Sequence, residues 1–184
     1  MLKDLGTLGG SVGSANWIND AGEVVGYAYV EGDQSAHPFL WKNGRMTDLG
    51  LPSGATCANA TSINSQGQVV GISGICGGPD GGGFLWENGG PIVDLNSLIP
   101  PGSEVQIVAA QNINDNGEIA CNGVLSNGDV HAILLVPCDE HDLGGCRNQV
   151  LGTGEITNKT PLTQEQVKSG RVPLTRLQAP TYSR

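Results

Sequence analysis

Two cysteines near the middle of the sequence have the spacing of a disulfide across a hairpin. Segment 64–67, Asn-Ser-Gln-Gly, fits a hairpin turn, and antiparallel pairing around it places Cys57 opposite about residue 74. Cys76 lies just beyond, at the open end of the same hairpin. A Cys57–Cys76 bridge is therefore expected, closing a loop of about 20 residues and stabilising the fold by roughly 3 kcal/mol.

The other three cysteines are assigned by their surroundings. Cys138 and Cys146 bracket the short segment CDEHDLGGC and are expected to form a second bridge. Zinc binding by this pair with His141 is the alternative, but the spacing does not match a ligand knuckle and a fourth ligand is lacking. Cys121 stands where other copies of an internal repeat have glycine, which predicts a buried small residue rather than a nucleophile.

Other segments resemble known sites without their deciding residues. Segment 112–119 has oxygen-bearing residues at alternate positions, but it lacks an acidic first calcium ligand and a glutamate at the twelfth position. The glycine-rich segment 77–83 is not followed by the Lys-Ser/Thr pair of a phosphate-binding loop. His37 and His131 occupy equivalent repeat positions and are expected to be scaffold residues. The sequence therefore predicts no catalytic residue, no cofactor and no metal site.

The three tryptophans are candidates for stacking against a sugar ring. Trp41 and Trp86 occupy matching positions in successive repeats, which favours core packing for both. Trp17 has Ser62 and Asn112 as its counterparts, so the repeat does not require an aromatic residue there. Trp17 is the predicted ligand-binding aromatic.

An internal repeat organises the elements that carry these residues. Its first anchor is an Ile-Asn pair, then two further residues, a glycine and a short apolar run, found at 18–25, 63–70 and 113–120. A second anchor is Phe-Leu-Trp or its equivalent, at 39–41, 84–86 and 133–135. A third is Asp-Leu-Gly or Asp-Leu-Asn, at 4–6, 48–50 and 94–96. Such self-similarity at a period of about 45–50 residues is typical of repeat architectures.

Each copy offers four short segments of β-branched, aromatic or aliphatic residues bounded by Gly and Asn, which predicts a four-stranded antiparallel meander. The fold class predicted is all-β, with about three such units arranged like the blades of a partial or open β-propeller. A parallel solenoid is the competing geometry, but the hairpin turns argue against it. The array is placed at 1–137, with units of about 3–46, 47–91 and 92–137, and residues 138–184 form a small cysteine loop and a flexible tail.

The array opens on the third anchor, which is interpreted as a fourth strand, and its last copy ends after three strands. Propellers use this offset to close their ring, with the first strand completing the last blade. Three blades are too few for closure, since propellers typically have at least four. The open blade faces would carry apolar side chains, so the chain is expected to be marginal as a monomer or to form a homodimer, such as a six-bladed ring.

Charge and hydropathy exclude two classes of partner. Residues 1–137 hold three basic and thirteen acidic side chains, a net charge of −10, so phosphate backbones would be repelled and nucleic acid is not expected as a partner. No apolar run approaches the length of a membrane span, and the sequence MLKDLGTLGG lacks the apolar region of a signal peptide.

The combination DLGTLGGSVGSANWINDAGEVVGYA with AHPFLWKNGRMTDLG resembles the HAF family of probable extracellular bacterial repeat proteins. The His-Ala-Phe triplet of that family reads here His-Pro-Phe at 37–39, Gly-Gly-Phe at 82–84 and His-Ala-Ile at 131–133. The resemblance covers about residues 3–137 and implies a propeller-like fold and an extracellular or cell-surface location. It implies no catalytic residue.

These observations together favour a non-catalytic, extracellular or surface-associated repeat protein that acts as a binding or structural module for an unknown protein or carbohydrate. The alternative is a fragment of a propeller-fold hydrolase or lyase with its active site at the channel mouth. Clustered carboxylates at one rim would favour the enzyme, whereas an exposed Trp17 without them would favour binding.

Overall fold

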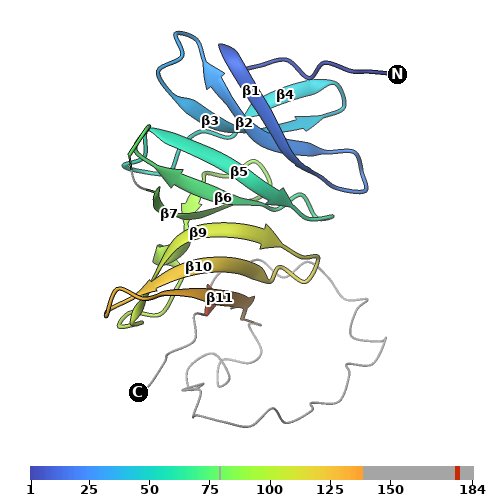
Figure 1. The fold of residues 1–184 in the computed structure, drawn as a ribbon. Helices are drawn as coiled ribbons and strands as arrows, with labels where there is room; N and C mark the ends of the chain where they lie inside the picture. Colours follow the sequence, from blue (N-terminus) through green and yellow to red (C-terminus); the bar gives the residue numbers. More distant parts are fainter. Residues whose placement is uncertain (79, 139–176, 179–184) are drawn as a thin grey trace, which may run out of the picture.

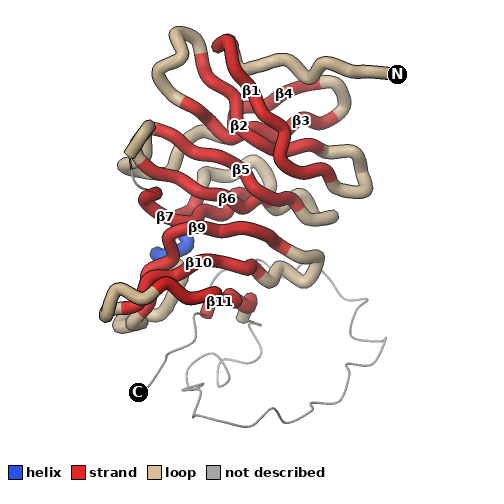
Figure 2. Tube along the Cα trace, in the orientation of Figure 1, coloured by secondary structure: helices blue, strands red, loops and turns tan. Residues whose placement is uncertain are grey.

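The computed structural model describes residues 1–78, 80–138 and 177–178. They form three antiparallel β-sheets, and helix is limited to the three-residue 3-10 turn η1 (Leu95–Ser97). The predicted all-β class and the absence of substantial helix between residues 10 and 135 are confirmed for this part of the chain. Figures 1 and 2 show the sheets following one another from the N-terminus to the C-terminus, with loops at both ends of the strands.

Each sheet is a meander whose strands pair in chain order. The first contains β1 (Gly9–Ile18), β2 (Val24–Val30), β3 (Ala36–Lys42) and β4 (Arg45–Asp48). The second contains β5 (Cys57–Ile63), β6 (Val69–Gly74), β7 (Asp80–Trp86) and β8 (Val93–Asp94). The third contains β9 (Val105–Ile113), β10 (Ile119–Leu125) and β11 (Val130–Pro137), and its fourth strand is β12 (Leu177–Gln178). The predicted units are displaced from these sheets, because the predicted boundaries at 46 and 91 fall within the last hairpin of a sheet.

The hairpin turns have the geometry that their sequences predict. Asn43 and Gly44 have φ values of 52° and 84°, and Asn88 and Gly89 have 52° and 76°. Positive φ at both central residues defines the turn whose twist matches that of paired strands, and Asn-Gly adopts it at little cost. These turns fix the register of β3 on β4 and of β7 on β8.

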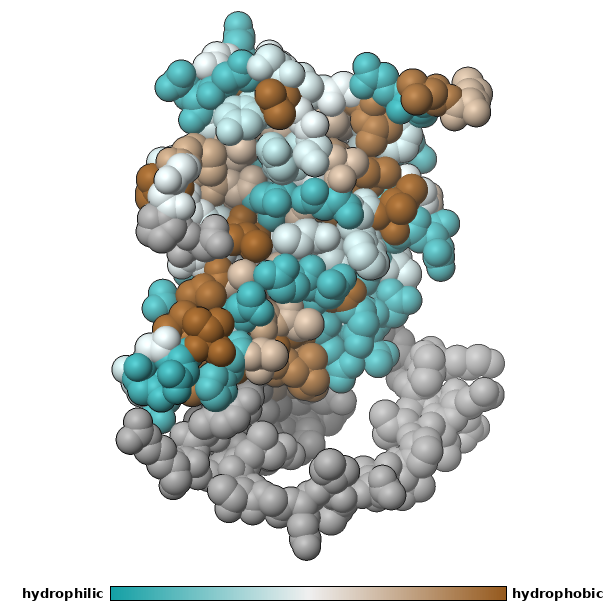
Figure 3. All heavy atoms as spheres, viewed as in Figure 1, coloured by the Kyte–Doolittle hydropathy of each residue, from teal (hydrophilic) through white to brown (hydrophobic). Residues whose placement is uncertain are grey.

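The sheets stack by placing the first strand of one sheet on the middle of the sheet before it. β5 packs against β2 and β3, and β9 packs against β6 and β7. The first strands are also neighbours of one another, since Nδ2 of Asn16 donates to the carbonyl oxygen of Ala60 at 2.8 Å and Oγ1 of Thr61 donates to that of Ala110 at 2.8 Å. The side along which β5 and β9 run is mainly hydrophilic, with separate hydrophobic patches (Figure 3).

Two apolar cores lie between the sheets, and a third lies on the far side of the first sheet. The core between the first and second sheets includes Val25, Ile63 and Phe84. The core between the second and third includes Leu85 and Ile107. Because the second sheet contributes side chains to both cores between the sheets, one from each face, a meander is stabilised by its neighbours rather than by itself.

The sequence analysis interpreted the Asp-Leu motif as a fourth strand, but in the structure its Asp ends a strand and its Leu lies beyond that strand. Asp48 and Asp94 end β4 and β8, and their carboxylates accept a hydrogen bond from the backbone N–H two residues later, as Asp4 also does. The leucine of each motif packs on the sheet that follows it, and these residues are Leu5, Leu49 and Leu95. Segment 4–8 therefore lies against the first sheet and does not complete the third one. The short turn after Asp places the leucine side chain against an apolar core, whereas β-propensity alone suggested a strand.

Equivalent asparagines link successive repeats. In Asn19, Asn64 and Asn114, Oδ1 accepts hydrogen bonds from the backbone N–H groups two and four residues later. Nδ2 of Asn19 donates to the carbonyl oxygen of Asn64 at 3.0 Å, and Nδ2 of Asn64 donates to that of Asn114 at 3.0 Å. We call this set of three residues the asparagine ladder. It holds the turns at one end of the stack in register.

Glycine is required where a first strand crosses closely over the next strand. A Cβ atom added to Gly71 would press on the carbonyl oxygen of Asn59 and lie 2.6 Å from the ring of Phe84. We expect Gly71→Ala to lower the free energy of unfolding by about 1–3 kcal/mol, the usual cost of overpacking. Chemical denaturation measures this. The control is Gly13→Ala, where the added atom meets its neighbours at 3.5 Å or more, and an equal loss there would contradict the explanation.

Candidate functional site

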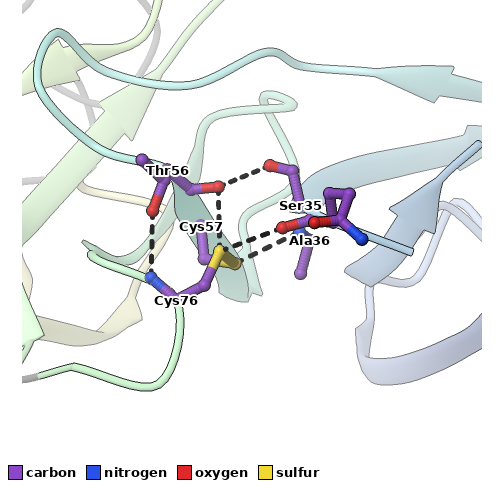
Figure 4. Close-up of a disulfide and its surroundings, with 6 residues drawn as sticks. Ser35, Ala36, Thr56, Cys57 and Cys76 are labelled. Carbon is purple, nitrogen blue, oxygen red and sulfur yellow. Dashed lines mark hydrogen bonds between the residues drawn. A yellow bond between two sulfur atoms is a disulfide. The ribbon is translucent and has the colours of Figure 1, made fainter. Parts of the chain in front are cut away.

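A disulfide joins Cys57 at the start of β5 to Cys76 beyond the end of β6, as predicted. It lies against the β2–β3 loop of the first sheet, where Sγ of Cys57 accepts a hydrogen bond from the backbone N–H of Ala36 at 3.2 Å. The carbonyl oxygen of Thr56 accepts one from the hydroxyl of Ser35, and Oγ1 of Thr56 accepts one from the N–H of Cys76 at 3.0 Å (Figure 4). The bridge thus fixes the loop end of the second sheet beside the first sheet.

Beside this bridge is a hollow with a volume of about 310 Å³. We call it the tyrosine hollow. Its walls come from β2, the start of β3, β5, β6 and the loop after β6. The lining residues are Tyr27, Tyr29, Ala36, 57–59 and 72–78. It opens at the end of the first two sheets opposite the asparagine ladder.

The described residues of the tyrosine hollow are aromatic, polar or small, and none of them carries a charge. The rings of Tyr27 and Tyr29 lie edge to face, with centroids 6.4 Å apart and planes inclined by 74°. Asn59 and Ser73 add amide and hydroxyl groups to the wall, and Oδ1 of Asn59 accepts a hydrogen bond from Nδ2 of Asn16 at 2.6 Å. Aromatic faces with a few fixed hydrogen-bonding groups suit a neutral ligand with both an apolar and a hydroxylated side.

The sequence analysis missed both tyrosines. They are two residues apart on β2 and therefore point to the same side of the sheet. At their places the second repeat has Ile72 and Gly74. This departure from the repeat pattern is the signal that could have identified them, because residues that the repeat does not need are free to serve a ligand.

Trp17 is exposed, as predicted, but it does not line the tyrosine hollow. Its exposed fraction is 47%, and it pairs with Val25 on β2, whereas Tyr27 pairs with Ser14. Trp86 is buried, in agreement with core packing, and Trp41 is half-buried, with Nζ of Lys3 4.4 Å from its ring centroid. The structure therefore separates the predicted aromatic from the hollow.

A second hollow, of about 460 Å³, lies on the outer side of the first sheet beside the Asn19 turn. In its wall, Nζ of Lys42 forms an ion pair with Oε1 of Glu23 at 2.5 Å. Burial by itself raises the pKa of the Glu23 carboxyl, but hydrogen bonds from Lys42 and Asn19 outweigh burial and hold that pKa below its ordinary value. The pair neutralises the one carboxylate that is buried there.

Cys121 is a buried free thiol, as predicted, with an exposed fraction of 3%. Burial raises its pKa to about 12, because the thiolate is poorly solvated inside the sheet. The other predicted bridge joins Cys138 to Cys146, and Cys146 lies outside the described residues.

We expect the Cys121 thiol to resist alkylation in the folded protein, because the thiolate is the reactive species and is scarce well below pH 12. Treatment with iodoacetamide at pH 8, followed by mass mapping, should leave Cys121 unlabelled, whereas the same treatment in denaturant should label it fully. Rapid labelling of the native protein would contradict the burial.

The remaining candidates have structural roles. Segment 112–119 contains a hairpin turn, in which Oδ1 of Asn114 accepts two backbone hydrogen bonds and the Asp115 carboxylate accepts one from the N–H of Ser65 at 2.9 Å. Nδ1 of His37 contacts the Asp48 carboxylate at 2.9 Å across β3 and β4. Among the described residues, no three His, Cys, Asp or Glu side chains gather as a metal site would require. The described part also has no helix long and apolar enough to cross a membrane.

Comparison of the chain with protein-family models, with curated protein sequences and with solved structures gives no significant match.

Proposed function

We propose that the chain is a non-catalytic, extracellular or surface-associated binding module built from HAF-like repeats, and that the tyrosine hollow takes a neutral carbohydrate. The observation that carries this proposal is the composition of the wall. Among the described residues, two tyrosine rings and an asparagine amide line it, and no charged side chain does. A sugar ring offers an apolar face to an aromatic side chain and hydroxyl groups to an amide, so this wall suits it.

The propeller-like arrangement is part of the proposal. Its support is that β5 and β9 pack on the preceding sheet and that β1, β5 and β9 run beside one another, as the inner strands of propeller blades do. The extracellular location is supported by the resemblance to HAF repeats and by the Cys57–Cys76 bridge, since disulfides persist in oxidising compartments.

The alternative is a fragment of a propeller-fold hydrolase or lyase. Such an enzyme would need several acids or histidines converging on one site. The tyrosine hollow offers hydroxyl and amide groups, which orient a ligand but do not transfer protons readily at neutral pH. Binding is therefore the function that this geometry supports better.

A glycan array followed by calorimetric titration with the strongest hit tests the proposal. Binding without turnover is expected, and Tyr27→Ala should weaken it by about tenfold or more, a loss of about 1.4 kcal/mol. Trp17→Ala is the matched control, because it removes an exposed aromatic outside the hollow. Release of a cleaved product would favour the enzyme. Binding that depends on Trp17 and not on Tyr27 would place the ligand elsewhere.

A further inference from the structure

The outer face of the first sheet has no second sheet over it. Leu5 and Leu8 pack against Val24, Ala28 and Phe39 on this face, but its edge at Ile18 stays open. Ile63 and Ile113 are only 2% and 7% exposed, because in each case the preceding sheet covers them. Their equivalent in the first repeat, Ile18, is 62% exposed. We call this outer face the leading face.

The third sheet has the complementary situation on its side away from the second sheet. Val70 and Leu85, at 0% and 2% exposure, lie in the core that the second sheet shares with the third. Their third-repeat equivalents Ala120 and Leu134 are both exposed, Leu134 by 51%. We call this side the trailing face. The leading and trailing faces thus correspond to the two halves of a contact that the stack already uses twice.

The polar part of that contact is a set of three hydrogen bonds from the second repeat to the third. Nδ2 of Asn64 donates to the carbonyl oxygen of Asn114 at 3.0 Å. The backbone N–H of Ser65 donates to Oδ1 of Asp115 at 2.9 Å, and Nε2 of Gln66 donates to the carbonyl oxygen of Asp115 at 2.7 Å. The two turns are therefore joined by three donors, which are two side-chain amides and one backbone N–H, and by three acceptors, which are one carboxylate and two carbonyl oxygens.

The same donors and acceptors recur at the two ends of the stack. At the places of the donors, the third repeat has the Asn114 amide, the Asp115 N–H and the Asn116 amide. At the places of the acceptors, the first repeat has the carbonyl oxygen of Asn19 together with the carboxylate and the carbonyl oxygen of Asp20. Asn114 to Asn116 and Asp20 are all exposed.

The contact between the first and second repeats does not use this full set. Ser65 has no carboxylate to accept a hydrogen bond from Asp20, and Ala21 has no side-chain amide, so the bond from Asn19 to Asn64 is the part of the set that these repeats share. The hydrogen-bond donors and acceptors at the two ends of the stack therefore complement each other better than those of the first and second repeats do. The hollow beside the Asn19 turn leaves room for an approaching turn, and Trp41 in its wall is more exposed than its equivalent Trp86.

We propose that the chain associates head to tail with a second copy of itself, the trailing face of one copy covering the leading face of the other. In this contact Leu134 and Ala120 pack against Ile18, as Leu85 and Val70 pack toward the third sheet within one chain. The turn at 114–116 bonds to Asn19 and Asp20 and extends the asparagine ladder across the two copies. The occupant is a second copy because the internal contact between the second and third repeats specifies both halves.

Sedimentation velocity of the full chain over a micromolar to submillimolar series tests this contact. Self-association is expected for the natural sequence. Ile18→Glu and Leu134→Glu should each weaken it about tenfold or more, because each places a charge in an apolar contact. Both positions are exposed within one chain, so circular dichroism should be unchanged. Ile75→Glu is the control for association alone: it lies at an exposed position in the wall of the tyrosine hollow, on neither face, and should associate normally.

Mixing the two variants distinguishes a head-to-tail contact from a symmetric one. Each variant retains one intact face, so an equimolar mixture of Ile18→Glu and Leu134→Glu should form heterodimers, although neither variant associates alone. A symmetric contact would leave one variant fully able to self-associate, and that result would overturn the proposal. A natural chain that stays monomeric throughout the series, or a mixture that stays monomeric, would also overturn it.

Discussion

Replacing Asn64 by alanine is expected to lower the free energy of unfolding by about 3 kcal/mol, because several buried polar groups lose their partner at once. The side chain is 3% exposed and accepts hydrogen bonds from the N–H groups of Gln66 and Gln68. It also donates to Oε1 of Gln68 and to the carbonyl oxygen of Asn114. Gln68 is itself buried, so water cannot replace the lost bonds. Urea denaturation measures the change.

Asn114→Ala is the matched control for this prediction. Asn114 makes the same bonds within its own turn, but it is exposed and lies at the end of the asparagine ladder. Water can satisfy the groups that its removal frees, so a loss of about 1 kcal/mol or less is expected when the protein is dilute. Equal losses for the two variants would mean that the asparagine shapes each turn separately and does not connect the repeats.

Removing the Cys57–Cys76 bridge has the second large expected effect. The two residues are 19 apart in sequence, and a loop of that length corresponds to about 3 kcal/mol of stability in the chain-entropy account. The variant Cys57→Ala/Cys76→Ala should show this loss in urea denaturation. It should also bind a ligand of the tyrosine hollow more weakly, because the bridge forms part of the wall.

The reduced natural protein serves as the control for the double variant. A reducing agent should lower the stability of the natural protein by at least the loss that the variant shows, and any further loss in the variant measures the second expected bridge, Cys138–Cys146. If the variant is as stable as the oxidised natural protein, the bridge follows the fold without stabilising it.

Local features of the fold could be predicted from the sequence because they depend on neighbouring residues. The Asn-Gly turns and the hairpin that brings Cys57 to Cys76 follow from one repeat considered alone, and the burial of Cys121 follows from its equivalence to glycine in the other repeats. The Asp-Leu motif was misassigned for the same reason. Considered alone, Leu49 is typical of a strand. Its side chain becomes part of an apolar core only because the second sheet packs over it.

Features that depend on how the repeats stack could not be predicted from single segments. The asparagine ladder requires the turns of successive repeats to lie side by side, which the recurrence of Ile-Asn suggests but does not specify. The tyrosine hollow requires the disulfide of the second repeat to face β2 of the first. Residues that depart from the repeat pattern, as Tyr27 and Tyr29 do, indicate the tyrosine hollow better than the tryptophans do.

Equivalent repeats are stacked through one recurring contact. Hydrogen exchange of the asparagine side chains measures that contact directly. In dilute protein, NMR should find the Asn64 amide strongly protected, since it is buried and bonded to the next repeat. The exposed amide of Asn114, at the end of the ladder, should exchange much faster. Equal exchange of the two side chains would contradict the stacking described here.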